Sequence, residues 1–312
     1  MKIKNVELKN NLILAPMAGV TEVAFRELCK KLGAGLTVTE MISVKGLYYN
    51  SKNTVRMLEI AENEHPVAVQ LFGHEPEIFS KVIQSGKLDK FDIIDINMGC
   101  PAPKIVKNGD GSALMQNIAL ASEIIKACVS STDKPVTVKF RKGFLTSDDC
   151  LIEFAKMCEE SGASAITVHP RTRAQMFGGK IDVLDIKKVK DAVKIPVIGN
   201  GDVVDKLSYE HMLTSNCDGI MIGRKALSCP DIFLTLQNKD SKYTIFDIAK
   251  MHIELLTKYY DKNVAVKIFK KHAVAYLSHL KGASELKSEI VRIDDFDKLS
   301  SRLLEILKQS SI

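Results

Sequence analysis

The chain has 312 residues, of which 46% are hydrophobic, and a formal net charge of +6. A chain of this length can bury one large core or two unequal cores, and its mild positive charge allows a polyanionic partner without requiring one. No apolar stretch approaches the roughly 18 residues of a membrane-spanning helix, and no export signal is visible, so we expect a cytoplasmic protein away from membranes.

Short β-rich apolar runs recur along the chain up to Asp231, and a stretch of helical periodicity follows each run. Continuous apolar runs are typical of strands that are buried on both faces of a parallel sheet. Eight strand–helix units over about 230 residues match an α/β fold of the TIM (β/α)8 barrel type. The predicted strands are Leu12–Ala15, Leu36–Thr39, Val67–Phe72, Phe91–Ile96, Val136–Phe140, Ala165–His169, Pro196–Gly199 and Gly219–Ile222.

The strand pattern stops after Asp231, and the remaining sequence predicts four amphipathic helices, at 246–260, 264–280, 283–290 and 294–309. We therefore expect two domains, a barrel over residues 1–240 and a small all-α domain over 241–312. The second segment holds thirteen Lys and Arg against nine Asp and Glu, so it carries most of the net charge. A solvated helical surface would show the same excess.

Polar segments follow the predicted strands, at the barrel end where TIM-barrel active sites lie. Glycines follow strands seven and eight, where many barrels bind a phosphate through backbone N–H groups; tight strand-to-helix turns are the alternative. The segments are Pro16–Gly19, Glu40–Met41, Gln70, Asn97–Pro101, Lys139 with Arg141, His169 with Arg171 and Arg173, Asn200–Asp202, and Gly223–Arg224.

Lys139 ends a buried apolar run, where a cation needs an anionic partner. A reduced flavin ring carries such negative charge, and Gln70 could hold the pyrimidine edge of that ring through its amide. A Schiff-base lysine, as in barrel aldolases, is the rival interpretation.

Seven cysteines are present without any C-x-x-C pair, so we expect reduced thiols, no structural zinc site and no bound metal. Cys100 alone follows a strand directly, between Gly99 and Pro101, which expose its thiol in a turn. It is therefore the candidate proton donor, and the other six cysteines are interpreted as packing residues.

Several motifs, read together, resemble the tRNA-dihydrouridine synthases, and most closely the bacterial B-type enzymes. They include DINMGCP (95–101), HPRTR (169–173) and NGD (200–202), and the resemblance continues through KIFKKHAVAYLSHLKG (267–282). Two positions depart from the family pattern: Pro170 replaces a glycine, and Asp110 stands where a small residue is usual.

The resemblance implies an FMN-binding barrel, a helical tRNA-recognition domain and NADPH as reductant. Hydride from reduced FMN would add to C6 of a D-loop uridine, and Cys100 would protonate C5. The residues expected to contact FMN are Pro16, Met17, Ala18, Gln70, Lys139, His169, Asn200, Gly201, Asp202, Gly223 and Arg224. Those expected to contact substrate are Asn97, Arg141, Arg171 and Arg173, with Lys267, Lys270 and Lys271 as a basic patch for tRNA.

Three alternatives remain beside this hypothesis. An FMN-dependent dehydrogenase of a free pyrimidine such as dihydroorotate would use the same barrel and a strand-end acid, but has no obvious use for basic C-terminal helices. A non-catalytic RNA-binding barrel would not need the complete set of Gln70, Cys100, Lys139 and His169. A barrel aldolase would use Lys139. In each case we expect a monomer.

Overall fold

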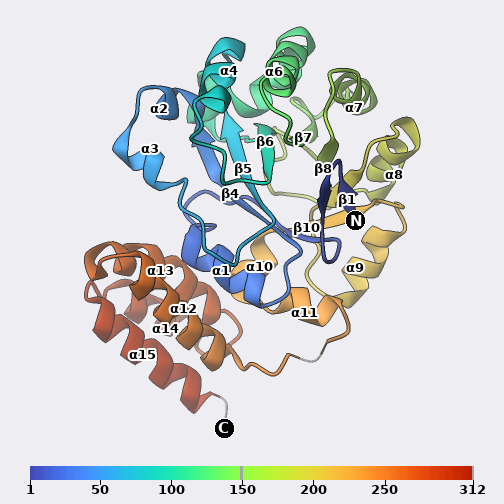
Figure 1. The fold of residues 1–312 in the computed structure, drawn as a ribbon. Helices are drawn as coiled ribbons and strands as arrows, with labels where there is room; N and C mark the ends of the chain where they lie inside the picture. Colours follow the sequence, from blue (N-terminus) through green and yellow to red (C-terminus); the bar gives the residue numbers. More distant parts are fainter. Residues whose placement is uncertain (148–149, 240, 311–312) are drawn as a thin grey trace.

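The computed structural model describes residues 1–147, 150–239 and 241–310. Eight parallel strands form a closed barrel ringed by helices, and β10 closes the barrel by pairing with β3 (Figure 1). The predicted TIM barrel is therefore confirmed. The barrel strands are β3 (Leu12–Leu14), β4 (Leu36–Ser43), β5 (Val67–Phe72), β6 (Ile93–Met98), β7 (Val136–Gly143), β8 (Ala165–Thr172), β9 (Val197–Asn200) and β10 (Gly219–Ile222).

Three of these strands extend three or four residues beyond their predicted ends, namely β4, β7 and β8. The extensions contain charged residues such as Glu40, Arg141 and Arg171, which the apolar pattern assigned to loops. Register shifts interrupt the ladder between Val38 and Met41 and between Arg141 and Gly143. Such irregularities re-aim side chains next to functional sites, so the pairing continues although the apolar pattern has ended.

A short hairpin, which the sequence pattern did not predict, precedes the barrel and consists of β1 (Lys2–Ile3) and β2 (Val6–Glu7). Ile3 and Leu8 are buried in one cluster with the barrel-interior residues Ile13, Val38 and Ile198. The hairpin region therefore fills the barrel at the end opposite the carboxyl ends of the strands.

Helices cover the outside of the barrel between successive strands (Figure 1). None of the helices in the described part of the chain is long and apolar enough to cross a membrane. These helices are α1 (Val23–Lys31), α2 (Val44–Tyr48), α3 (Lys52–Arg56), α4 (Pro76–Gln84), α5 (Pro103–Lys107), the 3-10 helix η1 (Gly111–Gln116), α6 (Ile118–Ser130), α7 (Leu151–Glu160), α8 (Val183–Ala192), α9 (Lys206–Leu213), α10 (Arg224–Ser228) and α11 (Ile232–Leu236).

The four predicted C-terminal helices are present and lie beside α1 at one side of the barrel (Figure 1). Phe25 and Leu28 of α1 belong to the same hydrophobic cluster as Leu256 and Phe269, so the packing is continuous from the barrel into these helices. The predicted domain boundary at residue 240 lies outside the described residues. The helices are α12 (Ile245–Tyr259), α13 (Lys262–Tyr276), α14 (Ala283–Val291) and α15 (Phe296–Gln309).

Candidate active site

A cavity of about 830 Å³ opens at the carboxyl ends of the barrel strands. Its volume lies in the range of small-molecule and cofactor sites, about 300–1,000 Å³. Arg171, Arg173 and the three lysines of the predicted basic patch do not line it. The predicted site residues that do line it are Pro16, Met17, Ala18, Gln70, Asn97, Cys100, Lys139, Arg141, His169, Asn200, Gly201, Asp202, Gly223 and Arg224.

The amide of Gln70 is held in place by a buried hydrogen-bond network on β5, β6 and β7. Its Nε2 donates to Asp95 Oδ2 at 2.7 Å, and its Oε1 accepts from Asn97 Nδ2 at 2.9 Å. Thr137 Oγ1 donates to the other oxygen of Asp95 at 2.6 Å. Burial raises the pKa of Asp95 to about 6, although the hydrogen bonds from Thr137 and Gln70 act in the opposite direction.

Gln70 can therefore present its second N–H to the cavity in one fixed orientation, because its other amide positions are occupied. Asp95, which sets this orientation, was not among the predicted site residues. Its position in the sequence gave one signal: it is a carboxylate inside the otherwise apolar strand 93–96.

The Cys100 loop is fixed from both sides. Asn97 Oδ1 accepts the backbone N–H of Cys100 at 2.9 Å, and the Cys100 carbonyl accepts both the N–H and the hydroxyl of Ser112, at 3.1 and 2.9 Å. Gly111 has φ of 61°, and a Cβ there would lie 2.9 Å from the Cys100 carbonyl oxygen. A side chain at this position would displace the loop, so glycine is needed there.

The Cys100 thiol lies half-buried in the wall of the cavity. Burial raises its pKa, and this effect is partly offset by a backbone hydrogen bond and by the positive charges of Arg141 and Lys139. The thiol is therefore protonated at neutral pH and available as an acid. Cys150 and Cys229 are also half-buried. Cys229 Sγ lies 3.7 Å from His279 Nε2, and a packing role for this cysteine stays a prediction.

The Lys139 ammonium faces the cavity and makes no hydrogen bond or ion pair with any residue in the described ranges. Burial lowers its pKa to about 8, the nearby Arg141 acts in the same direction, and Asp95 partly opposes both. A half-buried cation without a partner favours an anionic or electron-rich group beside it in the cavity.

Arg141 is only 2% exposed and its guanidinium donates to three backbone carbonyls. These belong to Gly99 at 2.9 Å, Thr172 at 3.0 Å and Met176 at 2.7 Å. The arginine therefore ties the Cys100 loop to the segment after β8. Its contact with substrate stays a prediction, and Nε and Nη1 already donate to these carbonyls.

His169 is neutral and has a defined tautomer. Its Nε2 lies 3.1 Å from Arg171 Nη1, and because arginine can only donate, Nε2 must accept. The proton of the neutral ring is then on Nδ1, available to a group in the cavity. Burial, together with the charges of Lys139, Arg141, Arg171 and Arg224, lowers the pKa of His169 to about 2.

Arg171 and Arg173 lie outside the cavity lining. Arg171 is 1% exposed and donates to Asp202 Oδ2 at 2.6 Å. The other oxygen of Asp202 lies 3.3 Å from Arg224 Nη2. The guanidinium carbon of Arg173 lies 5.1 Å from the centre of the Phe144 ring. In this arrangement the first arginine organises Asp202, and substrate contact by either one stays a prediction.

The cavity wall after β9 and β10 is formed largely by backbone. Gly201 has φ of 134°, and a Cβ there would lie 2.9 Å from Ile181 Cγ2. Asn200 Nδ2 donates to the Met221 carbonyl at 2.8 Å, and Gly223 immediately precedes α10. The exposed guanidinium of Arg224 adds positive charge at this edge. Close backbone approach with a nearby cation is the arrangement that binds a phosphate group.

The predicted basic patch lies on one face of α13, away from the cavity lining. Lys267 is exposed, Lys270 pairs with Asp294 at 2.5 Å, and Lys271 donates to the Gly19 carbonyl at 3.0 Å. Two of the three lysines therefore already have protein partners. Contact with tRNA stays a prediction for all three.

The sequence is similar to known proteins over nearly its whole length. The sequence model of a family described as "Dihydrouridine synthase (Dus)" matches residues 13–311. A "Probable tRNA-dihydrouridine synthase" of Rickettsia bellii is 37% identical, over 98% of this chain and 97% of its own length. The "tRNA-dihydrouridine synthase B" of Vibrio parahaemolyticus is 39% identical, over 94% of each chain.

Among solved structures, morphinone reductase is similar with a TM-score of 0.57 and 13% sequence identity, over 77% of this chain and 89% of its own. A likeness at this identity concerns the fold alone, and it agrees with the barrel described above.

Proposed function

The chain belongs to the dihydrouridine synthase family and forms dihydrouridine in tRNA, and we propose that it does so with FMN bound at the barrel mouth and NADPH as reductant. The proposed substrate is a uridine of the D-loop. Membership of this family removes the reason to consider the free-pyrimidine dehydrogenase, the barrel aldolase or the non-catalytic barrel.

The arrangement of the cavity fits FMN in three places. The Lys139 ammonium has no partner in the described ranges and would lie beside the electron-rich part of the ring. The second N–H of Gln70 would bind the pyrimidine edge. The backbone at Gly201, with Arg224 nearby, would hold the phosphate. When bound, FMN supplies the hydride, which no amino-acid side chain can provide.

Cys100 is the proposed proton donor to the uracil ring. The C4 carbonyl polarises the C5=C6 bond of uracil, so hydride adds at C6 and C5 requires a proton. The thiol is protonated at neutral pH, lies in the cavity wall and is held by Asn97 and Ser112. Its raised pKa also favours return of a proton from solvent after each turnover.

Asn97 and Arg141 act in this scheme as positioning residues. Asn97 accepts the Cys100 N–H and donates to Gln70, so it links the proton donor to the residue that holds the flavin edge. Arg141 binds the Gly99 carbonyl from the other side of the loop. His169 completes the wall with an N–H donor on Nδ1 for the flavin or the base.

The uridine must leave its stack in the folded tRNA to reach this cavity, at a cost of a few kcal/mol. Contacts between the tRNA backbone and the C-terminal helices are the proposed compensation. The excess of Lys and Arg in residues 241–312 supports this role.

The observation that carries the FMN proposal is the unpartnered Lys139 ammonium beside the fixed Gln70 amide. The purified protein is expected to be yellow, with visible absorption that bleaches on addition of NADPH. It should then form dihydrouridine in an unmodified tRNA transcript. A colourless protein that gains no absorption after addition of FMN would contradict the proposal, and mapping dihydrouridine in cells lacking the protein would identify the uridine.

A further inference from the structure

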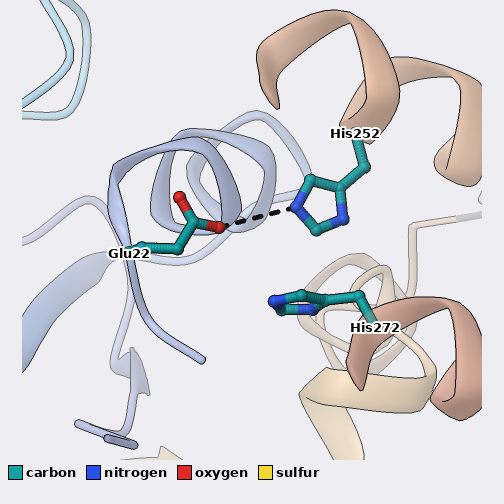
Figure 2. A group of neighbouring side chains, drawn as sticks. All are labelled: Glu22, His252 and His272. Carbon is teal, nitrogen blue, oxygen red and sulfur yellow. Dashed lines mark ion pairs between the residues drawn. The ribbon is translucent and has the colours of Figure 1, made fainter. Parts of the chain in front are cut away.

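Three metal-ligand side chains meet at the junction between the barrel and the C-terminal helices (Figure 2). Glu22 is the N-cap residue of α1, His252 lies on α12 and His272 lies on α13. Glu22 is 6% exposed and both histidines are 0% exposed. One ligand atom from each residue lies within 4.8 Å of the other two. The junction is therefore a closed, polar site inside an otherwise apolar contact.

Three of the four imidazole nitrogens of this cluster lack hydrogen bonds in the described part of the chain. His252 Nε2 and both ring nitrogens of His272 are buried without a partner among the described residues. The nearest approach, from His252 Nε2 to Glu22 Oε1, is 3.6 Å, too long for a hydrogen bond. Native structures rarely leave buried polar atoms unsatisfied, and a bound ion or water is one explanation for such atoms.

Protonation of the histidines does not resolve the problem. Burial lowers the pKa of His252 to about 3 and that of His272 well below its ordinary value. A neutral imidazole has one ring nitrogen with a free lone pair, which can bind a cation. Burial also raises the pKa of Glu22, which would gain from a positive charge close to its oxygens.

The other ring nitrogen of His252 has a hydrogen-bonding partner. Its Nδ1 lies 2.8 Å from the hydroxyl of Tyr276. If Nδ1–H donates to this oxygen, the lone pair of Nε2 points toward Glu22, as Figure 2 shows for that edge of the ring. A second hydrogen-bonding partner of this kind is the usual support of a histidine that ligates a metal.

We propose that Glu22, His252 and His272 bind one divalent transition-metal ion of the zinc class, which joins α1 to α12 and α13. Two imidazoles and one carboxylate are a ligand set that zinc uses, and a tetrahedral site would have room for one further ligand such as water. Glu22 also borders a smaller cavity of about 220 Å³ with Glu40 and Tyr260, which neither histidine lines.

This site is separate from the proposed chemistry, because none of its three residues lines the 830 Å³ cavity. Its role would be structural: it would fix the orientation of the C-terminal helices against the barrel. We expected no bound metal because the sequence has no C-x-x-C pair. That expectation considered only ligands close together in the sequence.

The direct test is the metal content of the full-length protein. Protein from zinc-supplemented cells, washed with EDTA, is expected to contain one zinc ion per chain by mass spectrometry. Protein unfolded with chelator and refolded with Co²⁺ should show the visible absorption of a low-symmetry cobalt site. Absence of metal in both preparations would overturn the proposal and leave the cluster as a packing contact, whatever the variants do.

Variants locate the ion. The ring centres of His272 and Phe25 lie 4.6 Å apart, so His272→Phe keeps an aromatic ring in contact with Phe25. This variant should lose the metal, and zinc should raise the melting temperature of the wild type but not that of the variant. Tyr276→Phe should lower zinc affinity about tenfold. The control is His211→Ala, an exposed histidine outside the cluster, which should keep the metal. A folded His272→Phe protein that retains one zinc ion would contradict this assignment.

Discussion

The barrel mouth and the junction with the C-terminal helices both contain buried polar side chains, but these side chains are compensated differently. At the mouth, Gln70, Asp95 and Asn97 satisfy one another, and Lys139 faces a cavity of about 830 Å³. At the junction, His252 Nε2 and both ring nitrogens of His272 are closed off from solvent and have no hydrogen-bonding partner among the described residues. An unpaired group beside a large cavity favours an organic ligand. The unpaired nitrogens in the closed interior of the junction are the observation behind the proposed ion.

The two regions also differ in their backbone. Segments at the mouth include residues with positive φ, among them Met176 at 52°, Asp202 at 49° and Gly201 at 134°. The junction is built from the regular helices α1, α12 and α13. Unusual backbone conformations are common at ligand-binding sites, whereas regular helices give extensive side-chain packing.

The largest expected effect is on chemistry at the mouth. Cys100→Ala should slow dihydrouridine formation by about 10²–10⁴-fold, because the ring loses its proton donor. Reduction of the flavin by NADPH should continue, because it does not use the thiol. Single-turnover assays with unmodified tRNA would measure both steps. Cys229→Ala, a half-buried cysteine outside the cavity lining, is the control. Undiminished product formation in the Cys100 variant would remove this residue from the mechanism.

Two phenylalanine truncations separate the regions by stability. Phe269 is fully buried at the junction, and Phe269→Ala should lower the free energy of unfolding by about 3–5 kcal/mol. Phe177 is 53% exposed at the mouth, so Phe177→Ala should change the free energy of unfolding by less than about 0.5 kcal/mol. Denaturant unfolding of both variants provides the measurement. Equal losses would mean that the two regions do not differ in packing as described.

Lys139 should make FMN affinity depend on pH. Below its pKa of about 8 the lysine is already protonated, so affinity should be level. Above that pH, binding must take up a proton, and affinity should fall by up to about tenfold per pH unit. Lys139→Met should bind more weakly and lose this dependence.

The matched control is Lys30→Met. Burial also lowers the pKa of Lys30 to about 8, but this lysine does not line the cavity. Titration of FMN into the flavin-free protein would therefore show the pH dependence in the wild type and in the Lys30 variant. A Lys139 variant with an unchanged pH profile would show that this lysine does not contact the flavin.

The smallest expected effect concerns the helical surface. If Lys267 and Lys271 contact tRNA phosphates, replacing either with alanine should reduce the slope of log affinity against log salt concentration by about one. Lys187→Ala is the control, because this lysine is half-buried on α8, far from α13 in the sequence, and pairs with Asp191. If the α13 variants leave the slope of log affinity against log salt concentration unchanged, these lysines are solvated and do not contact tRNA phosphates.

Much of the barrel could be predicted from the sequence, because a strand buried on both faces needs a continuous apolar run such as Gly219–Ile222. The four C-terminal helices could be predicted from their amphipathic period. Cys100 could be singled out because Gly99 and Pro101 place it in a turn after a strand. These are local properties, and residues near one another in the chain determine them.

Tertiary structure decided the rest. Arg141 binds a backbone carbonyl and Arg171 binds Asp202. The sequence could not predict these partners, because they lie on segments that meet only when the barrel closes. Asp95 became part of the site because Gln70 and Thr137 reach it from neighbouring strands. The cluster of Glu22, His252 and His272 forms only where α1 packs against α12 and α13. Sequence patterns report which face of an element is apolar, whereas side-chain partners depend on which elements pack together.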